Sequence, residues 1–228
     1  MPTETEPQLL TYQNWTFRYR PGRENFGHLL VLLHGLSGDE TSMWFFTRSL
    51  PPGGALLAPR APFPAPEAGY SWREFGSANK ELPSLEQLRP SVDSLLAFLD
   101  GWSASAHVQT EVIHLMGFSQ GAAMTYAFAL LHPERVHAIA ALSGFLLAGA
   151  EPLLEQRRLD GKPVFVSHGS QDEMVPVELA RRAVSFLKAS GASVTYCEAE
   201  TGHKVSSDCL KGVESFFRSI YNQPVTPD

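Results

Sequence analysis

The sequence predicts an α/β fold in which helices pack on both faces of a mostly parallel central sheet. Short apolar runs bounded by turn residues alternate with segments of helical periodicity, a pattern typical of successive strand–helix–strand units. Several runs, such as "LLVLL" at residues 29–33, are continuously apolar, which indicates strands buried on both faces. The 228 residues are 43% hydrophobic and 18% charged, which suits one soluble globular domain, 1–228, with a sizeable core.

Seven strands are expected, six of them in the parallel part of the sheet, where "LLVLL", "IAAL" and "VFV" are continuously apolar. These six are residues 29–33, 55–58, 112–117, 138–142, 164–168 and 194–198. Residues 15–20, "WTFRYR", alternate large apolar and polar side chains, so we expect an antiparallel edge strand there. Residues 1–10 are expected to be a loosely ordered N-terminus.

Three helices are defined by their period and their caps. In residues 84–102, Ser84 followed by Gln87 resembles a capping box, whereas Pro90 predicts a kink or a later start. Residues 176–191 begin with proline and stop at glycine, and residues 206–220 carry a buried apolar stripe. Both of these segments are expected to cover the sheet.

Residues 59–83, "PRAPFPAPEAGYSWREFGSANKELP", contain too much proline for a helix or a central strand. We expect a long ordered loop packed over the active-site end of the sheet, because long loops in compact domains are often functional. The alternative is a surface excursion whose aromatic residues only seal the core.

Charge and the N-terminus limit the expected partners and compartment. The formal net charge of −6, with no run of Lys or Arg, argues against nucleic acid or an anionic membrane as the main partner and favours a small-molecule ligand. The segment "MPTETEPQLL" lacks the basic and apolar regions of a secretory signal, and no stretch approaches the length of a membrane span. We therefore expect a cytoplasmic protein.

The chain has two cysteines, Cys197 and Cys209, without CxxC spacing or a nearby histidine pair. This arrangement predicts neither a zinc site nor a disulfide, and we expect both residues to be small half-buried side chains.

The segment "GFSQG", residues 117–121, lies between a predicted strand and a predicted helix. A serine at such a sharp turn is the nucleophile of many hydrolases, and glycines on either side remove the Cβ atoms that would collide with it. Ser119 would then lie at the N-terminus of a helix, where free N–H groups and the helix dipole favour a developing oxyanion. A Gly/Ser-rich turn without chemistry is the alternative, and only partner residues elsewhere can decide.

Two later loops supply those partners, each after its own predicted strand. Asp172 follows "VFVSH", and His203 follows "VTYCEAE" in "TGHKV". The chain order Ser, Asp, His is that of the α/β-hydrolase architecture, in which the three loops converge at the carboxyl ends of the strands. The competing acids are Glu173, which we expect to be solvated, and Asp208, which we expect in the first turn of a helix.

The remaining histidines compete with His203 less well. His34 and His168 each precede a glycine at a strand end, and both are expected to be turn residues satisfied by hydrogen bonds. The oxyanion donors should be the N–H groups of Gln120 and of Leu36, the latter in the loop after strand 29–33.

Together, the blocks "LLHGLSGDE", "GFSQGAAM", "LSGFL", "SHGSQDEMVP" and "TGHKV" resemble the phospholipase/carboxylesterase family of serine hydrolases, which includes bacterial carboxylesterases and acyl-protein thioesterases. The resemblance implies an α/β-hydrolase fold without a large cap domain, with Ser119 as nucleophile, His203 as base and Asp172 as its orienting acid. It also implies a shallow acyl groove. The substrate-binding residues that match are Trp72, Phe75, Phe145 and Val175.

The predicted activity is cleavage of carboxylic esters, or of acyl thioesters, through an acyl-enzyme, with no metal and no organic cofactor. A dienelactone-hydrolase-like enzyme is one alternative, although those enzymes typically carry cysteine where this chain has Ser119. A non-catalytic binding protein with the same fold is the other. Either a monomer or a weak homodimer is compatible with the sequence.

Overall fold

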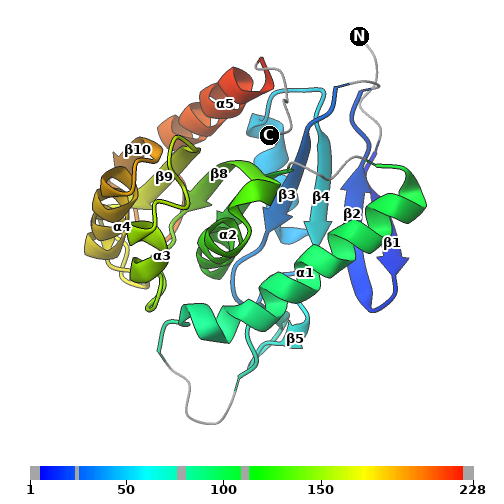
Figure 1. Cartoon of the computed structure of the whole chain (residues 1–228), viewed down its shortest axis with the longest axis horizontal. Coiled ribbons are helices and arrows are strands. Elements are labelled where there is room, and N and C mark those ends of the chain that lie inside the picture. Colours follow the sequence, from blue (N-terminus) through cyan, green and yellow to red (C-terminus); the bar gives the residue numbers. More distant parts are fainter. Residues whose placement is uncertain (1–5, 24–25, 76–80, 109–112, 223–228) are drawn as a thin grey trace.

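The computed structural model describes residues 6–23, 26–75, 81–108 and 113–222. Their largest sheet has the strand order β1-β2-β4-β3-β7-β8-β9-β10, and every neighbouring pair from β4 to β10 is parallel. Its strands are β1 (Gln8–Tyr12), β2 (Trp15–Arg20), β3 (Leu29–Leu33), β4 (Ala55–Pro59), β7 (Ile113–Phe118), β8 (Val136–Leu142), β9 (Pro163–Gly169) and β10 (Ser193–Ala199). The mostly parallel sheet confirms the predicted fold (Figure 1).

Helices cover both faces of this sheet (Figure 1). The helices are η1 (Ser42–Ser49), α1 (Leu85–Ala106), α2 (Gln120–Leu131), η2 (Pro133–Arg135), α3 (Glu151–Glu155), α4 (Val177–Ala189) and α5 (Ser207–Tyr221). Buried side chains of α1, α2, α3 and α4 share one core cluster with Leu29, Val31 and Leu33, whereas those of α5 and η1 share another with Leu30 and Leu32. Strand β3 is therefore buried on both faces, which explains its unbroken apolarity.

The N-terminal region differs from the prediction. Residues 8–10 belong to β1, so the expected loosely ordered N-terminus is wrong for them, while residues 1–5 lie outside the described part of the chain. Strand β2 is not an edge strand, because β1 pairs with it in an antiparallel register that sets Leu10 opposite Phe17. Leu10 also packs against the core, so burial of its side chain accompanies the added strand pairing.

Helix α1 begins where its cap predicts. Ser84 Oγ accepts a hydrogen bond from Gln87 N, and Gln87 Oε1 accepts one from Ser84 N. The helix then runs through Pro90 to Ala106, so the expected later start is wrong. A buried stripe that includes Leu88 and Val92 on either side of the proline offsets the lost backbone hydrogen bond. Of the described helices, none is long and apolar enough to cross a bilayer.

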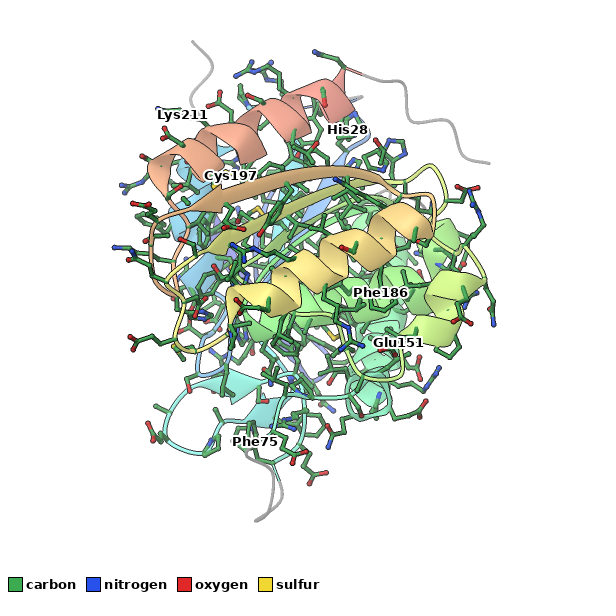
Figure 2. The ribbon with its side chains drawn as sticks, turned by 90° about the vertical axis from the view of Figure 1, so that its left-hand side faces the viewer. His28, Phe75, Glu151, Phe186, Cys197 and Lys211 are labelled. Carbon is green, nitrogen blue, oxygen red and sulfur yellow. A yellow bond between two sulfur atoms is a disulfide. The ribbon has the colours of Figure 1, made fainter. Side chains whose placement is uncertain are left out.

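A disulfide joins Cys197 in β10 to Cys209 in the first turn of α5. The prediction that neither cysteine forms a disulfide is therefore wrong. The spacing of the two residues carries no disulfide signature, but α5 folds back along β10 and brings their Cα atoms to 5.7 Å. Figure 2 shows Cys197 on the strand directly beneath α5.

Candidate active site

Ser119 lies at the turn between β7 and α2, with a φ of 54° that is unusual for a residue with a side chain. The turn is closed by two glycines. A Cβ atom on Gly117 would lie 2.1 Å from the carbonyl oxygen of Gly121, and one on Gly121 would lie 2.0 Å from that of Leu33. Both distances are far shorter than a van der Waals contact, so the packing around this turn requires glycine at both positions.

The N-terminus of α2 starts at the residue after this serine. Ala122 N and Ala123 N both donate to Ser119 O, whereas the helix provides no acceptor for the N–H of Gln120 in its first turn. The Gln120 side chain is buried, and its Oε1 accepts from Trp72 N at 3.0 Å. This contact holds the side chain behind the turn, and the backbone N–H is left as a donor beside Ser119.

Asp172 and His203 are brought together from the loops after β9 and β10. His203 Nδ1 donates to Asp172 Oδ2 at 2.7 Å, and Asp172 Oδ1 accepts from Met174 N at 3.0 Å and Val175 N at 2.9 Å. The competing acids lie elsewhere. Glu173 is exposed, and Asp208 sits in the first turn of α5, where it pairs with Lys211.

The His203 ring lies beside the residue that precedes Ser119. The His203 ring centroid lies 5.0 Å from that of Phe118, the residue before Ser119. Because Nδ1 carries its proton toward Asp172, Nε2 is the nitrogen with a free lone pair, and it is buried without a hydrogen-bond partner in the described chain. This atom can accept a proton.

His168 lies directly behind Asp172, with both side chains fully buried. Its Nε2 donates to Val175 O at 2.8 Å and lies 3.4 Å from Asp172 Oδ2. A carbonyl oxygen can only accept, so Nε2 carries the proton. His168 therefore fixes the loop that presents the carboxylate through Nε2, whereas its Nδ1 is buried without a hydrogen-bond partner in the described chain, so the expected satisfaction holds for one nitrogen only.

His34 fixes the backbone on the other side of Ser119. Ala61 N donates to its Nε2 at 3.0 Å, so Nδ1 carries the proton and donates to Gly35 O at 2.7 Å. Burial lowers the pKa of His34, which favours this neutral form even though the bond to Gly35 O opposes the shift. In a trans peptide the N–H points opposite to the C=O, so the Leu36 N–H points away from the His34 ring.

Gly35 and Leu36 lie against the nucleophile. A Cβ built on Gly35 would lie 3.3 Å from Ser119 Cβ, so the two loops are in contact. Within the described residues no acceptor bonds the Leu36 N–H. The N–H groups of Leu36 and Gln120 are therefore two backbone donors without a bonded acceptor in the described chain, and both belong to segments in contact with Ser119.

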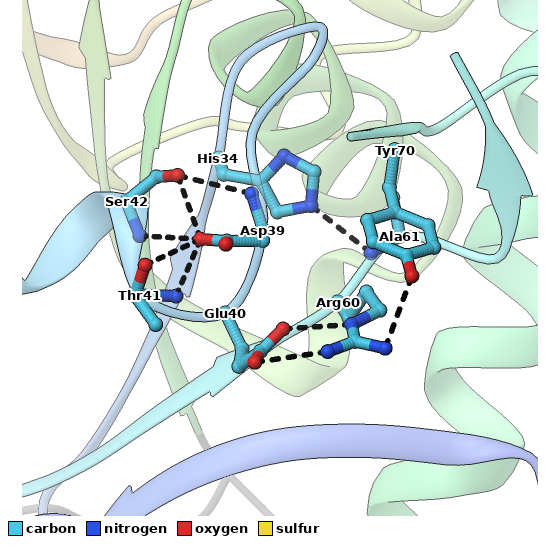
Figure 3. Close-up of polar contacts among 8 residues, drawn as sticks. All are labelled: His34, Asp39, Glu40, Thr41, Ser42, Arg60, Ala61 and Tyr70. Atoms are coloured by element: carbon cyan, nitrogen blue, oxygen red, sulfur yellow. Dashed lines mark hydrogen bonds and ion pairs between the residues drawn. The ribbon is translucent and has the colours of Figure 1, made fainter. Parts of the chain in front are cut away.

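A polar network holds the loop that follows Leu36 (Figure 3). Asp39 Oδ1 accepts from the backbone N–H and hydroxyl groups of Thr41 and Ser42, which fixes the start of η1. Glu40 receives a bidentate pair from Arg60, with Nε at 2.7 Å and the second nitrogen at 3.0 Å, and this donation lowers the pKa of Glu40. Arg60 also donates to Tyr70 Oη at 3.1 Å. These bonds anchor the loop to the segment after β4.

A second connection uses the small sheet of β5 (Phe63–Pro64) and β6 (Tyr70–Ser71). Ser37 N donates to Tyr70 O at 3.0 Å, and Tyr70 N donates to Gly38 O at 2.9 Å. The predicted long loop 59–83 thus contains a short hairpin that is bonded to the loop bearing Leu36.

A cavity of about 890 Å³ opens beside Ser119. Its lining contains most of the predicted site residues, namely Leu36, Phe75, Ser119, Gln120, Phe145 and Val175. Segment 59–83 contributes a large share of the wall, namely Pro64, Ala65, Pro66, Glu67, Arg73, Phe75, Glu81, Leu82 and Pro83. The cavity is mainly apolar, which suits an acyl or aryl group.

Trp72 does not line the cavity, contrary to the prediction. Its side chain is fully buried, and its indole N–H donates to His34 O at 2.8 Å. A buried indole requires such an acceptor, so the Trp72 side chain packs against the His34 backbone and does not line the cavity. Its neighbour Arg73 lines the cavity instead, with its guanidinium 4.6 Å from the Phe75 ring, and burial lowers the pKa of Arg73.

Sequence reasoning also missed Met174, which lines the cavity and is 72% exposed. Met174 lies between Asp172 and Val175, in the loop that the sequence predicts to carry the catalytic acid, and this position could have indicated that it lies near the cavity. Across the described ranges, no three His, Cys, Asp or Glu side chains are grouped so that they could hold a metal ion.

Comparisons with known proteins report on the family and the fold of this chain. The model of the phospholipase/carboxylesterase family matches residues 19–221. Carboxylesterase SOBER1 of Arabidopsis thaliana is 34% identical over 114 residues, and acyl-protein thioesterase 1 of Kluyveromyces lactis is 36% identical over 83 residues. The match to SOBER1 covers 47% of this chain and 48% of that protein, and the match to the thioesterase covers 36% of each. The chain therefore aligns with half or less of the length of these relatives. The crystal structure of esterase PE8 superposes with a TM-score of 0.76 at 29% identity, covering 89% of this chain and 97% of that one.

Proposed function

This chain belongs to the phospholipase/carboxylesterase family, and from that membership we propose that it hydrolyses carboxylic esters, or acyl thioesters, through a covalent acyl-enzyme. The observation that carries the proposal is the 2.7 Å hydrogen bond between His203 Nδ1 and Asp172 Oδ2, with the imidazole beside the residue that precedes Ser119. A serine needs such a base to become a nucleophile at neutral pH.

In the proposed mechanism, His203 Nε2 takes the proton of Ser119 Oγ as this oxygen attacks the substrate carbonyl carbon. Asp172 holds the imidazole in the required tautomer and stabilises the imidazolium. Collapse of the tetrahedral intermediate breaks the bond to the alcohol or thiol, which leaves with the proton from His203. A water molecule, deprotonated by the same nitrogen, then attacks the acyl-serine, and His203 returns this proton to Ser119 Oγ as the carboxylic acid is released.

The oxyanion of both tetrahedral intermediates would accept hydrogen bonds from Leu36 N–H and Gln120 N–H. The His34 bond to Gly35 O and the anchored loop behind it support this role, because donors that are already oriented need no reorganisation during the reaction. Removing one such donor typically costs about 10²–10³ in kcat.

The apolar cavity supports an acyl or aryl ester as the substrate, with Phe75, Phe145 and Val175 as substrate-binding residues. The preference between oxygen esters and thioesters requires a kcat/KM series over p-nitrophenyl acyl esters with one acyl thioester included. Each methylene in an apolar pocket contributes about 1–3 kcal/mol of discrimination, so the series should show a gradual optimum.

Labelling with a fluorophosphonate probe, combined with Ser119→Ala, tests the proposal. We expect a covalent adduct on Ser119 in the wild type, and a fall in kcat of about 10⁴–10⁶ in the variant without loss of folding. Ser143→Ala is a matched control, because Ser143 also follows a strand end with a positive φ of 49° but has no role in the proposed mechanism. An unlabelled folded protein would favour the non-catalytic binding protein instead.

Three further predictions accompany this proposal. The partner is a small molecule, and the protein is a monomer or a weak homodimer, which sedimentation would measure. The expected cytoplasmic location stays a prediction, and cell fractionation tests it. The Cys197–Cys209 disulfide makes that test informative, because disulfides persist mainly in oxidising compartments.

A further inference from the structure

The disulfide closes a ring of chain that contains the proposed base. Cys197 and Cys209 are separated by 12 positions, and His203 lies midway between them in the sequence. The ring consists of the end of β10, the loop that carries His203 and the first turn of α5. Nothing in the proposed mechanism uses either cysteine.

The two halves of this loop are anchored differently. The first half is bonded to the loop after β9, because Ser170 N donates to Ala199 O at 2.8 Å and Gln171 N donates to Thr201 O at 3.0 Å. In the second half, the bond from Lys204 N to Gly202 O at 2.7 Å is local and does not reach another element. Val205, at the end of this half, packs against the core cluster that contains the buried side chains of α5. The position of the second half therefore depends on where α5 lies and begins.

The start of α5 is fixed to the sheet by the disulfide. Ser206 Oγ caps the helix by accepting from Cys209 N at 3.2 Å, so the capping residue, Cys209 and the end of the His203 loop form one rigid turn. Farther along α5, buried Val213 and Phe217 hold the helix on the sheet without the disulfide. The covalent bond thus acts on the turn next to His203 more than on the fold as a whole.

We propose that the Cys197–Cys209 disulfide positions His203, so that its reduction slows the proposed hydrolysis in a protein that stays folded. The inference rests on the proposed function, since His203 must be the base for its placement to matter. It names Cys197 and Cys209 as positioning residues, which act through the loop and do not touch the substrate.

Reduction needs an external dithiol, and Cys197 is the accessible end. Cys197 lies on the outermost strand of the sheet (Figure 2). It is partly exposed, whereas Cys209 is buried. A thiolate of the dithiol attacks Cys197 Sγ and expels Cys209 as a thiolate, and the second thiol of the reagent then expels Cys197. Two electrons and two protons pass to the protein, which gains two thiols, and the reagent becomes a cyclic disulfide.

A loss of placement should reduce turnover more than binding. A displacement of 1 Å in a catalytic group can cost about 10²-fold, and here the Asp172 hydrogen bond and the first half of the loop remain. We therefore expect kcat to fall by about tenfold, with KM changing less than about twofold.

The experiment compares three forms of the wild type, namely untreated, reduced with dithiothreitol and reoxidised. It also includes three variants, namely the double variant Cys197→Ala/Cys209→Ala, Ser119→Ala and Val213→Ala. The assay uses a short p-nitrophenyl ester well below every unfolding midpoint, with thiols counted by alkylation and folding followed by circular dichroism. Val213→Ala is the matched control, because it weakens the packing of the same helix and leaves the disulfide intact.

We expect reduced wild type and the double variant to share the lowered kcat, the double variant to be insensitive to dithiothreitol, and reoxidation to restore wild-type turnover. Val213→Ala should lower the midpoint of unfolding and leave kcat unchanged. A folded wild type with two free thiols and full kcat would overturn the inference, and so would an equal loss of kcat in Val213→Ala. Full activity in Ser119→Ala would instead overturn the proposed function, so the two failures are distinguishable. If the double variant does not fold, the reduction and reoxidation of wild type decide.

Discussion

Replacing His34 with leucine should separate the oxyanion hole from the rest of the site. The leucine removes two buried hydrogen bonds, the donation of Nδ1 to Gly35 O at 2.7 Å and the donation of Ala61 N to Nε2 at 3.0 Å. The Ala61 N–H then loses its partner in a buried position, whereas Gly35 O keeps the hydrogen bond that Gly38 N donates at 3.1 Å. The unsatisfied N–H costs about 1–3 kcal/mol and the lost bond to Gly35 O about 0.5–1.5 kcal/mol, so the free energy of unfolding should fall by about 1.5–4.5 kcal/mol.

The effect on turnover follows from the same bond. Without the Nδ1 donor, the Gly35–Leu36 peptide loses the shorter of the two hydrogen bonds to Gly35 O and keeps the 3.1 Å bond from Gly38 N, so the direction of the Leu36 N–H is held less firmly. Losing one oxyanion donor costs about 10²–10³ in kcat. The assay is kcat and KM on a p-nitrophenyl ester, beside urea unfolding of the same preparation.

His34→Asn is the control that separates orientation from stability. The side-chain nitrogen of asparagine lies close to the position of Nδ1, so this variant can still donate to Gly35 O and loses only the bond from Ala61. We expect it to recover most of kcat while remaining about 1–3 kcal/mol less stable than the wild type. A folded His34→Leu protein with wild-type kcat would refute the reasoning, and so would equal losses of kcat in the two variants.

Two further predictions concern packing and acid stability. Gly121→Ala should destabilise the protein and abolish activity, because the new Cβ would lie 2.0 Å from Leu33 O. A soluble variant with the unfolding midpoint and the kcat of the wild type would contradict this prediction. The pKa values of His28 and His114 are lowered, mainly by burial and also by the neighbouring His137, so the unfolded chain takes up protons first as the pH falls. Stability should be complete above about pH 6.5 and should decrease below it by up to about 1.4 kcal/mol per pH unit for each proton. Chemical denaturation from pH 5 to 8 measures this, and His114→Gln should show a smaller slope than the wild type.

Much of the fold could be predicted from local pattern. Strands β2 and β3 have the predicted bounds, because alternation and continuous apolarity report directly on how many faces of a strand are buried. The start of α1 could also be predicted, because Ser84 and Gln87 form the capping hydrogen bonds within a single turn of the chain. Strand β1 was missed, because its polar and exposed residues gain their place only by pairing with β2.

The candidate site divides in the same way. Ser119, Asp172 and His203 could be selected because each follows its own strand, and parallel strands bring their carboxyl ends to one edge of a sheet. Trp72 was assigned to the wrong side of the loop, since the sequence identifies a large aromatic residue but not the direction in which it points. Its direction is set by the His34 carbonyl, which lies 38 positions away in the chain.

By itself, the sequence determined the parallel sheet, the turn that holds Ser119 and the order of its partners, because these depend on residue type, period and spacing along the chain. Only the tertiary structure decided the disulfide between Cys197 and Cys209, the orientation of the Leu36 amide by His34, and the wall of the cavity. Each of these depends on groups that are distant in sequence or on the direction of a single peptide. Such distances and directions are fixed by packing, and no local pattern records them.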